Sequence, residues 1–159
     1  MIMVGMAQWT VSDDPAATLA IAGLGSCVGL VVYEPQRKIA ALAHVLLPDS
    51  RAAMEVRQPA KFADTAVPLL CGALTERGAR PDLLVAKVAG GARMFRSPGP
   101  ELALGARNVD AVMAALAAQS IPILASDVGG TVGRTIRFHV GTLALEVASR
   151  DPRASRVIL

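Results

Sequence analysis

A cysteine and a histidine are the two side chains of this sequence best suited to nucleophilic chemistry. Cys27 follows Gly25 and Ser26 in the stretch Gly-Leu-Gly-Ser-Cys, and His44 lies in a later apolar run. A thiolate is the reactive form of cysteine, and a neighbouring imidazole can take the thiol proton and later return it. The glycines let a substrate approach the backbone closely, and the amide N–H groups of Ser26 and Cys27 are suited to holding an oxyanion.

A predicted turn brings Cys27 and His44 toward each other. Residues 34–37 read Glu-Pro-Gln-Arg, with proline at the second position as in a type I turn. If the turn is centred between Pro35 and Gln36 and joins antiparallel strands, Cys27 lies opposite a residue near position 44, and cross-strand Cβ atoms are ~5 Å apart. The alternative is that Cys27 is a small buried apolar residue, the usual role of a free cysteine.

The remaining cysteine and histidine predict no metal site. Cys71 and His139 are far from Cys27 and His44 in the sequence, without the close ligand spacing of a zinc site. Cys71 falls in a predicted helix, which favours a structural role. His139 falls near the end of a late strand, where we expect it to be structural or solvent-facing.

Two glycine pairs follow predicted strands. Neither Gly90–Gly91 nor Gly129–Gly130 precedes the Gly-Lys-Ser/Thr of a phosphate-binding loop. Two interpretations stay open for them: tight turns or close backbone packing, and the rim of a site.

The elements that must position these residues are short strands and two helices. Helices are predicted over residues 64–77, with Asp64 or Thr65 as N-cap, and around the apolar stripe of residues 109, 112, 113 and 116, ending near Ser120. Because strands gather at both ends of the chain and helices lie between them, we expect the α+β class. The predicted strands are residues 18–24, 27 or 28–33, 39–47, 83–88, 121–128, 135–140 and 142–147, the last two forming a hairpin around Gly141.

Composition limits the function classes. The 159 residues predict a single domain over residues 1–159, with residues 150–159 as a partly ordered tail. A net charge of +3, no dense Lys/Arg run and 3% aromatic residues argue against a nucleic-acid partner. Two cysteines make no disulfide framework, so a reducing cytoplasmic setting is expected. Residues 15–33 carry no charge, but three glycines interrupt them and a second apolar run follows, which predicts buried strands and no membrane insertion.

Six sequence blocks together resemble the chemoreceptor glutamine deamidase family, CheD. They occur in the family's order over about residues 18–147. The blocks are GLGSCVGLVVYEP, ALAHVLLPDS, KFADTAVPLL, AKVAGGARMF, LGARNVDAV and SDVGGTVGRTIRF.

The resemblance implies a fold and an activity. The fold is a layered α/β/β sandwich, similar to the catalytic domain of cytotoxic necrotising factor toxins, with mostly antiparallel sheets and two main helices. The activity is hydrolysis of the side-chain amide of selected glutamines on cytoplasmic helices of bacterial chemoreceptors, giving glutamate and ammonia. Cys27 and His44 match the family's nucleophile and base. The expected protein is a monomer without metal, nucleotide or organic cofactor, and the CheC phosphatase is a partner of many members.

Two positions depart from the family pattern. The family commonly has a threonine six residues before the cysteine, where this chain has Ile21, which cannot form a side-chain hydrogen bond. The family also commonly has an asparagine where this chain has Thr131. The Ile21 departure leaves a second hypothesis open: a non-enzymatic or weakly active chemotaxis module that binds the receptor or the CheC phosphatase.

Overall fold

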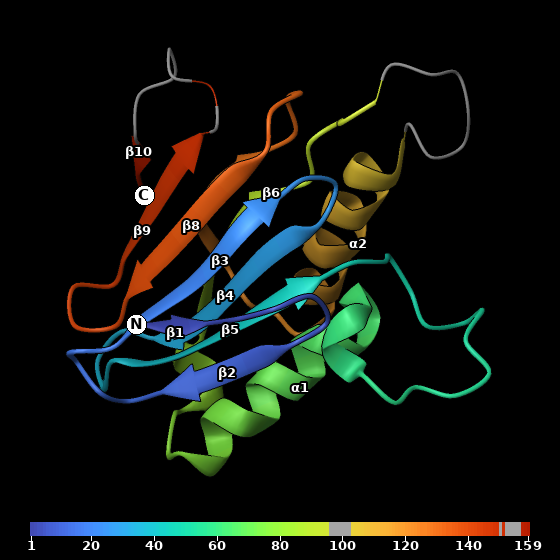
Figure 1. Cartoon of the computed structure of the whole chain (residues 1–159). Helices are drawn as coiled ribbons and strands as arrows, with labels where there is room; N and C mark the ends of the chain where they lie inside the picture. Colours follow the sequence, from blue (N-terminus) through green and yellow to red (C-terminus); the bar gives the residue numbers. More distant parts are fainter. Residues whose placement is uncertain (96–102, 150, 152–156) are drawn as a thin grey trace.

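Two five-stranded sheets and two α-helices make up the described part of the chain, which in this computed structural model is residues 1–95, 103–149, 151 and 157–159 (Figure 1). The first sheet has the order β1 (Ile2–Met3), β3 (Thr18–Leu24), β8 (Arg134–His139), β9 (Ala144–Ser149) and β10 (Val157–Ile158). The second has the order β2 (Trp9–Ser12), β5 (Ile39–Val45), β4 (Val28–Glu34), β6 (Val85–Gly90) and β7 (Ile123–Val128). The helices are α1 (Ala63–Glu76) and α2 (Leu104–Ala118), with short 3₁₀ turns η1 (Pro59–Lys61) and η2 (Pro81–Leu83).

The second sheet forms the middle layer of an α/β/β sandwich. In β4, Val28, Leu30 and Val32 pack with residues of both helices, whereas Val31 and Tyr33 pack with residues of the first sheet. Because β4 is covered on both faces, it is apolar along most of its length and does not alternate with polar residues. All strand pairs are antiparallel except β1–β3 and β6–β7. The predicted α+β layered sandwich with mostly antiparallel sheets and two main helices is therefore confirmed.

The seven predicted strands all overlap observed ones, and three further strands were not predicted. Strand β3 has the predicted limits, whereas β1 and β10 contain two residues each and β2 contains four. Such short strands give no readable two-residue period. Strand β10 lies in the predicted tail; residues 150 and 152–156 of that tail lie outside the described residues.

Helix α1 begins one residue earlier than predicted, and its predicted N-cap is wrong. The N-cap is Phe62, which makes no side-chain capping bond. Asp64 lies in the first turn and accepts hydrogen bonds from the amide and hydroxyl of Ser50, at 3.0 and 2.8 Å. Pro68 lies inside the helix. Neither α1 nor α2 combines the length and the apolar character that a bilayer-crossing helix needs, among the residues described.

Both predicted hairpin turns are longer than expected. Residues 35–38 separate β4 from β5, so Glu34 pairs with Ile39, and residues 140–143 separate β8 from β9. The last turn residues, Lys38 and Leu143, have φ values of 54° and 61°. The left-handed residue adds length to each turn and moves the register of the strands that follow.

Candidate active site

Cys27 lies in a loop whose carbonyl groups are all held by hydrogen bonds. This cysteine loop, residues 25–27, joins β3 to β4. The amide of Ala92 donates to the Gly25 carbonyl, and the amide of Gly91 donates to the Cys27 carbonyl, both at 2.8 Å. The side-chain amide of Asn108 on α2 donates to the Ser26 carbonyl at 2.9 Å. The loop therefore has a backbone fixed from the side of α2.

The fixed carbonyls determine where the loop amides point. In a trans peptide the N–H lies opposite the C=O of the same unit. The N–H of Cys27 therefore points away from Asn108 on α2, and the N–H of Ser26 points away from Ala92. This orientation is the one that the predicted oxyanion role of Ser26 and Cys27 needs.

His44 lies on β5 and is buried between the two sheets. Leu42, two residues earlier on the same face of β5, belongs to the core between the two sheets. Only 4% of the His44 surface is exposed. Hydrogen bonds to backbone groups of Val4 and Gly5 raise the pKa of the imidazole, but burial lowers it by more. The Nδ1 atom is buried and has no hydrogen-bond partner among the described residues. A buried ring nitrogen without a partner costs stability, which suggests a use in chemistry.

The predicted direct pairing of Cys27 with His44 is wrong by two residues. His44 lies opposite Gly29, and the ladder between β4 and β5 ends at Val28 and Val45. Cys27 precedes Gly29 by two residues, so its place is diagonal to His44, a relation with Cα atoms ~7–8 Å apart. Cys27 packs against the inter-sheet core, the same side that His44 faces. A Cys27–His44 pair stays a prediction, now as diagonal neighbours.

Burial keeps both groups neutral at rest. It raises the pKa of the Cys27 thiol, although the residue's own amide partly offsets this, and it lowers the pKa of His44. At neutral pH the dominant forms are therefore a thiol at Cys27 and an uncharged imidazole at His44. Such a pair works by general-base removal of the thiol proton as the attack occurs.

The resting state can be checked by alkylation. Since the pKa of Cys27 is raised, the rate of its reaction with iodoacetamide should increase with pH through a midpoint above the ordinary thiol value of about 8.5. Peptide mass spectrometry would follow Cys27 apart from Cys71, in the wild type and in Cys71→Ala. A midpoint below about 7 would contradict this, because it requires a thiolate–imidazolium pair at rest.

Ile21 lies beside the Gly29–His44 pair. It is fully buried, and a Cβ built on Gly29 would be 3.5 Å from its Cδ1 and 2.3 Å from Ile136 Cδ1. Glycine at position 29 therefore lets the first sheet approach the second closely. Ile21 has the place from which a threonine could reach the site, but it contributes only apolar packing. The backbone carbonyls of Val4 and Gly5, which raise the pKa of His44, are alternative groups for orienting the ring.

Ile21→Thr should therefore not accelerate the proposed deamidation. We expect a change in rate below about threefold and a lower melting temperature, since the substitution buries a hydroxyl and removes core volume. Ile21→Val is the matched control, because valine has the shape of threonine without the hydroxyl. A tenfold or greater gain specific to Ile21→Thr would show that the hydroxyl at position 21 is what His44 lacks.

The glycine pairs lie directly behind the cysteine loop. A Cβ on Gly90, whose φ is 111°, would be 2.4 Å from the Cys27 carbonyl oxygen. The amide of Gly129 donates to the Gly90 carbonyl at 2.9 Å, so the second pair stacks on the first. Both interpretations from the sequence hold: the pairs allow close backbone packing, and they do so beside the candidate site.

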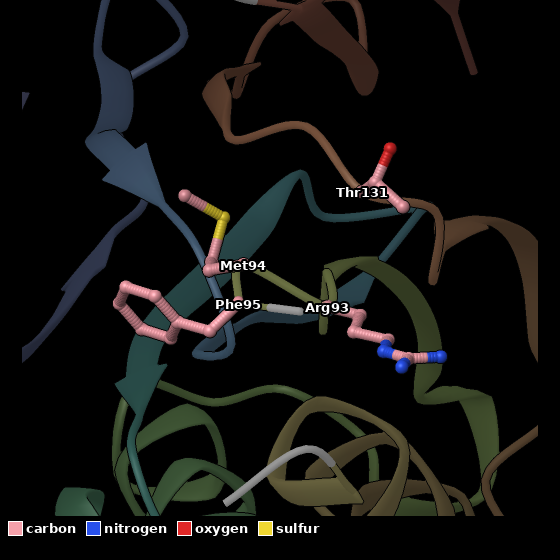
Figure 2. A pocket seen from close by; sticks show the side chains of 4 residues that line it. All are labelled: Arg93, Met94, Phe95 and Thr131. Atoms are coloured by element: carbon pink, nitrogen blue, oxygen red, sulfur yellow. The ribbon is translucent and has the colours of Figure 1, made fainter. Parts of the chain in front are cut away.

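A hollow of about 540 Å³ has Met94, a neighbour of Gly25 in the cysteine loop, in its lining. Arg93, Met94, Phe95 and Thr131 line it, and Arg93 and Phe95 extend to opposite sides (Figure 2). Met94 Cγ lies 3.0 Å from where a Cβ on Gly25 would be. Met94 and Phe95 are 43% and 71% exposed, so apolar surface is available next to the cysteine loop. Thr131, the second departure from the family pattern, belongs to this rim.

The other cysteine and histidine lie elsewhere. Cys71 is on α1 and packs against the core between the helices and the second sheet. His139 ends β8 and shares a 3.1 Å hydrogen bond with Thr18. The described residues contain no group of three or more His, Cys, Asp or Glu side chains placed to hold a metal ion.

Sequence reasoning missed Asn108. It is fully buried, and its side-chain amide reaches the Ser26 and Leu46 carbonyls, each at 2.9 Å. The available signal was its position four residues before Val112, on the apolar stripe of α2. A polar residue on a buried helix face needs partners, so it marks a contact beyond packing.

A layered sandwich with a cysteine in an anchored loop and a buried histidine on the adjoining strand has the parts that a thiol-dependent amide hydrolase needs. The family model for CheD, described as chemotactic sensory transduction, matches residues 46–149. The chain is 47% identical to a probable chemoreceptor glutamine deamidase CheD of Symbiobacterium thermophilum, over 87% of this chain and 86% of the relative. It is also 47% identical to the chemoreceptor glutamine deamidase CheD of Halalkalibacterium halodurans, over 92% of each chain. This protein belongs to the CheD family.

The comparisons differ in whether they include Cys27 and His44. The family-model match begins after His44, so it does not include the cysteine loop or the histidine. The Halalkalibacterium match covers 92% of this chain, so it includes both the cysteine loop and His44. A crystal structure of the Bacillus licheniformis hypothetical protein YfiH aligns with a TM-score of 0.41 at 15% identity, over 72% of this chain and 49% of that one.

Proposed function

We propose that this protein is a protein-glutamine deamidase of bacterial chemotaxis, with Cys27 as nucleophile and His44 as base. One observation carries the proposal: Cys27 is in a backbone-anchored loop, and the buried His44 faces the same side of the sheet with a free Nδ1. The family supplies the substrate class, because relatives with 47% identity are named chemoreceptor glutamine deamidases.

The reaction follows from these groups. His44 takes the thiol proton as Cys27 Sγ attacks the carboxamide carbon of a receptor glutamine, and the amides of Ser26 and Cys27 hold the oxyanion. His44 then gives the proton to the leaving nitrogen, so ammonia departs and a thioester remains. A water molecule, deprotonated by His44, hydrolyses the thioester to glutamate and restores the thiol. Each turnover consumes one water and releases one ammonia.

The surface near Cys27 fits a polypeptide substrate. The adjoining hollow is open and its rim carries the exposed Met94 and Phe95, which suit the apolar stripe of a receptor helix better than a free amino acid. A substrate on cytoplasmic receptor helices implies a cytoplasmic enzyme. We further propose that it acts as a monomer without a cofactor, and that the CheC phosphatase is a partner where one is present.

The test is direct observation of the product. Purified protein incubated with cytoplasmic receptor fragments should add about 1 Da per converted glutamine and release ammonia in equal amount. Measured binding of the receptor without any mass gain would overturn the enzyme proposal and support the non-enzymatic binding module.

A further inference from the structure

We propose that Asn108 is a positioning residue that holds the cysteine loop in register with the strand carrying His44. The inference rests on the proposed function, because it assigns Asn108 a role in the geometry of the Cys27–His44 pair. Its two side-chain N–H groups donate to the Ser26 and Leu46 carbonyls, each at 2.9 Å. Ser26 immediately precedes Cys27, and Leu46 is two residues beyond His44.

Asn108 connects the two strands at the point where their own ladder stops. The last pair between β4 and β5 is Val28 with Val45, and Cys27 with Leu46 would be the next. The Leu46 amide instead donates to the backbone carbonyl of Lys61 at 2.9 Å. The Leu46 carbonyl accepts from the side-chain amide of Asn108. The side-chain amide thus replaces the missing connection between the strands while leaving Cys27 outside the ladder.

The helix is built to bring Asn108 this close. A Cβ on Gly105, one turn earlier on α2, would lie 2.6 Å from the Gly91 carbonyl oxygen, so only glycine permits the contact. Gly91 in turn donates to the Cys27 carbonyl. Helix α2 therefore packs on the segment that backs the cysteine loop, and Asn108 projects from the same face.

The orientation of the Asn108 amide follows from its partners. Both of its N–H groups meet carbonyl oxygens, so the reverse orientation would set oxygen against oxygen. The Oδ1 atom is buried and has no partner among the described residues. An apolar residue would fill this place without an unsatisfied oxygen, and what asparagine adds is the pair of donors. Fixing the Ser26 carbonyl also fixes the direction of the Cys27 N–H in the same peptide unit, which is one of the proposed oxyanion donors.

The experiment compares Asn108→Ala with Val112→Ala, which truncates a fully buried side chain one turn further along the same helix. Asn108→Ala should lower kcat for receptor fragments by about tenfold to a hundredfold, the effect of a reacting group misplaced by about 1 Å, with KM nearly unchanged. The midpoint pH of Cys27 alkylation should fall toward the ordinary thiol value, because a released cysteine loop exposes the thiol and burial is the main cause of its raised pKa. Val112→Ala should lose thermal stability and keep both kcat and the alkylation midpoint.

Each outcome decides the inference. If Asn108→Ala matches Val112→Ala in kcat and in alkylation midpoint, Asn108 is structural and the inference is wrong. If Asn108→Ala does not fold, Asn108→Asp, which keeps the volume and loses the donors at neutral pH, is measured in its place, and failure of both to fold also overturns the inference. If wild type and Cys27→Ala deamidate equally, the proposed function fails instead, and the alkylation midpoint still reports on Asn108.

Discussion

Replacing Cys27 by alanine should abolish deamidation of receptor fragments while leaving the protein folded and able to bind them. The mechanism passes through a thioester on Cys27, so its loss removes the whole covalent pathway. We expect kcat to fall by about 10⁴-fold or more, as removal of a catalytic nucleophile does. The mass gain of about 1 Da per glutamine, followed over hours, measures the remaining rate.

Cys71→Ala is the control for this prediction. Cys71 is the second cysteine of the chain, half-buried like Cys27, but it lies on α1 against a different core. Its substitution should leave kcat within about twofold and cost some thermal stability through lost packing. Full activity in Cys27→Ala would refute the proposed nucleophile, and equal loss in both variants would indicate a general effect on the fold.

The sequence predicted the main strands of the fold because its apolar runs are long, whereas the layered arrangement was implied by the resemblance to the CheD family. Strands β3, β4 and β5 each contain seven residues, and β4 and β5 are buried throughout. In β4 and β5, alternate residues face the helices and the first sheet in turn. A run of this length bounded by glycine, proline or charge is readable without knowledge of its neighbours.

The register of the candidate pair could not be predicted, because it depends on one turn residue. Lys38 adopts a φ of 54°, a conformation that glycine or asparagine would have signalled and lysine does not. The longer turn moves His44 from Cys27 to Gly29. The same feature at Leu143 lengthens the second hairpin. The sequence thus placed His44 on the correct strand but not opposite the correct residue.

Contacts between residues distant in the sequence could not be predicted either. The backbone carbonyls that raise the pKa of His44 belong to Val4 and Gly5, which lie between two strands too short to be recognised. The anchor of the cysteine loop comes from Asn108, more than 80 residues along the chain. These contacts supply groups that orient the reactive side chains, which the sequence around Cys27, His44 and Ile21 does not reveal. The isoleucine departure is therefore weaker evidence against activity than it is in the sequence alone.

His44→Ala should lower kcat by about 10²–10⁴-fold, the usual contribution of a positioned acid–base group. The thiol pKa is raised by burial, so without a base few molecules carry a thiolate at neutral pH. Activity of the variant should therefore increase steeply toward high pH, where hydroxide can deprotonate Cys27. The wild type should instead keep its rate down to a pH below about 6.5, because the pKa of His44 is lowered and the imidazole stays neutral there.

His139→Ala is the matched control, since His139 is the other histidine and lies on the first sheet with Thr18 as its partner. It should retain the wild-type rate and pH profile. The pH profile separates a catalytic role from a structural one, because loss of packing alone lowers the amount of folded enzyme without changing the pH at which the remainder works. A His44→Ala variant with a reduced rate and an unchanged profile would therefore leave Cys27 without its proposed base, and the group that accepts the thiol proton would have to be sought elsewhere around the cysteine loop.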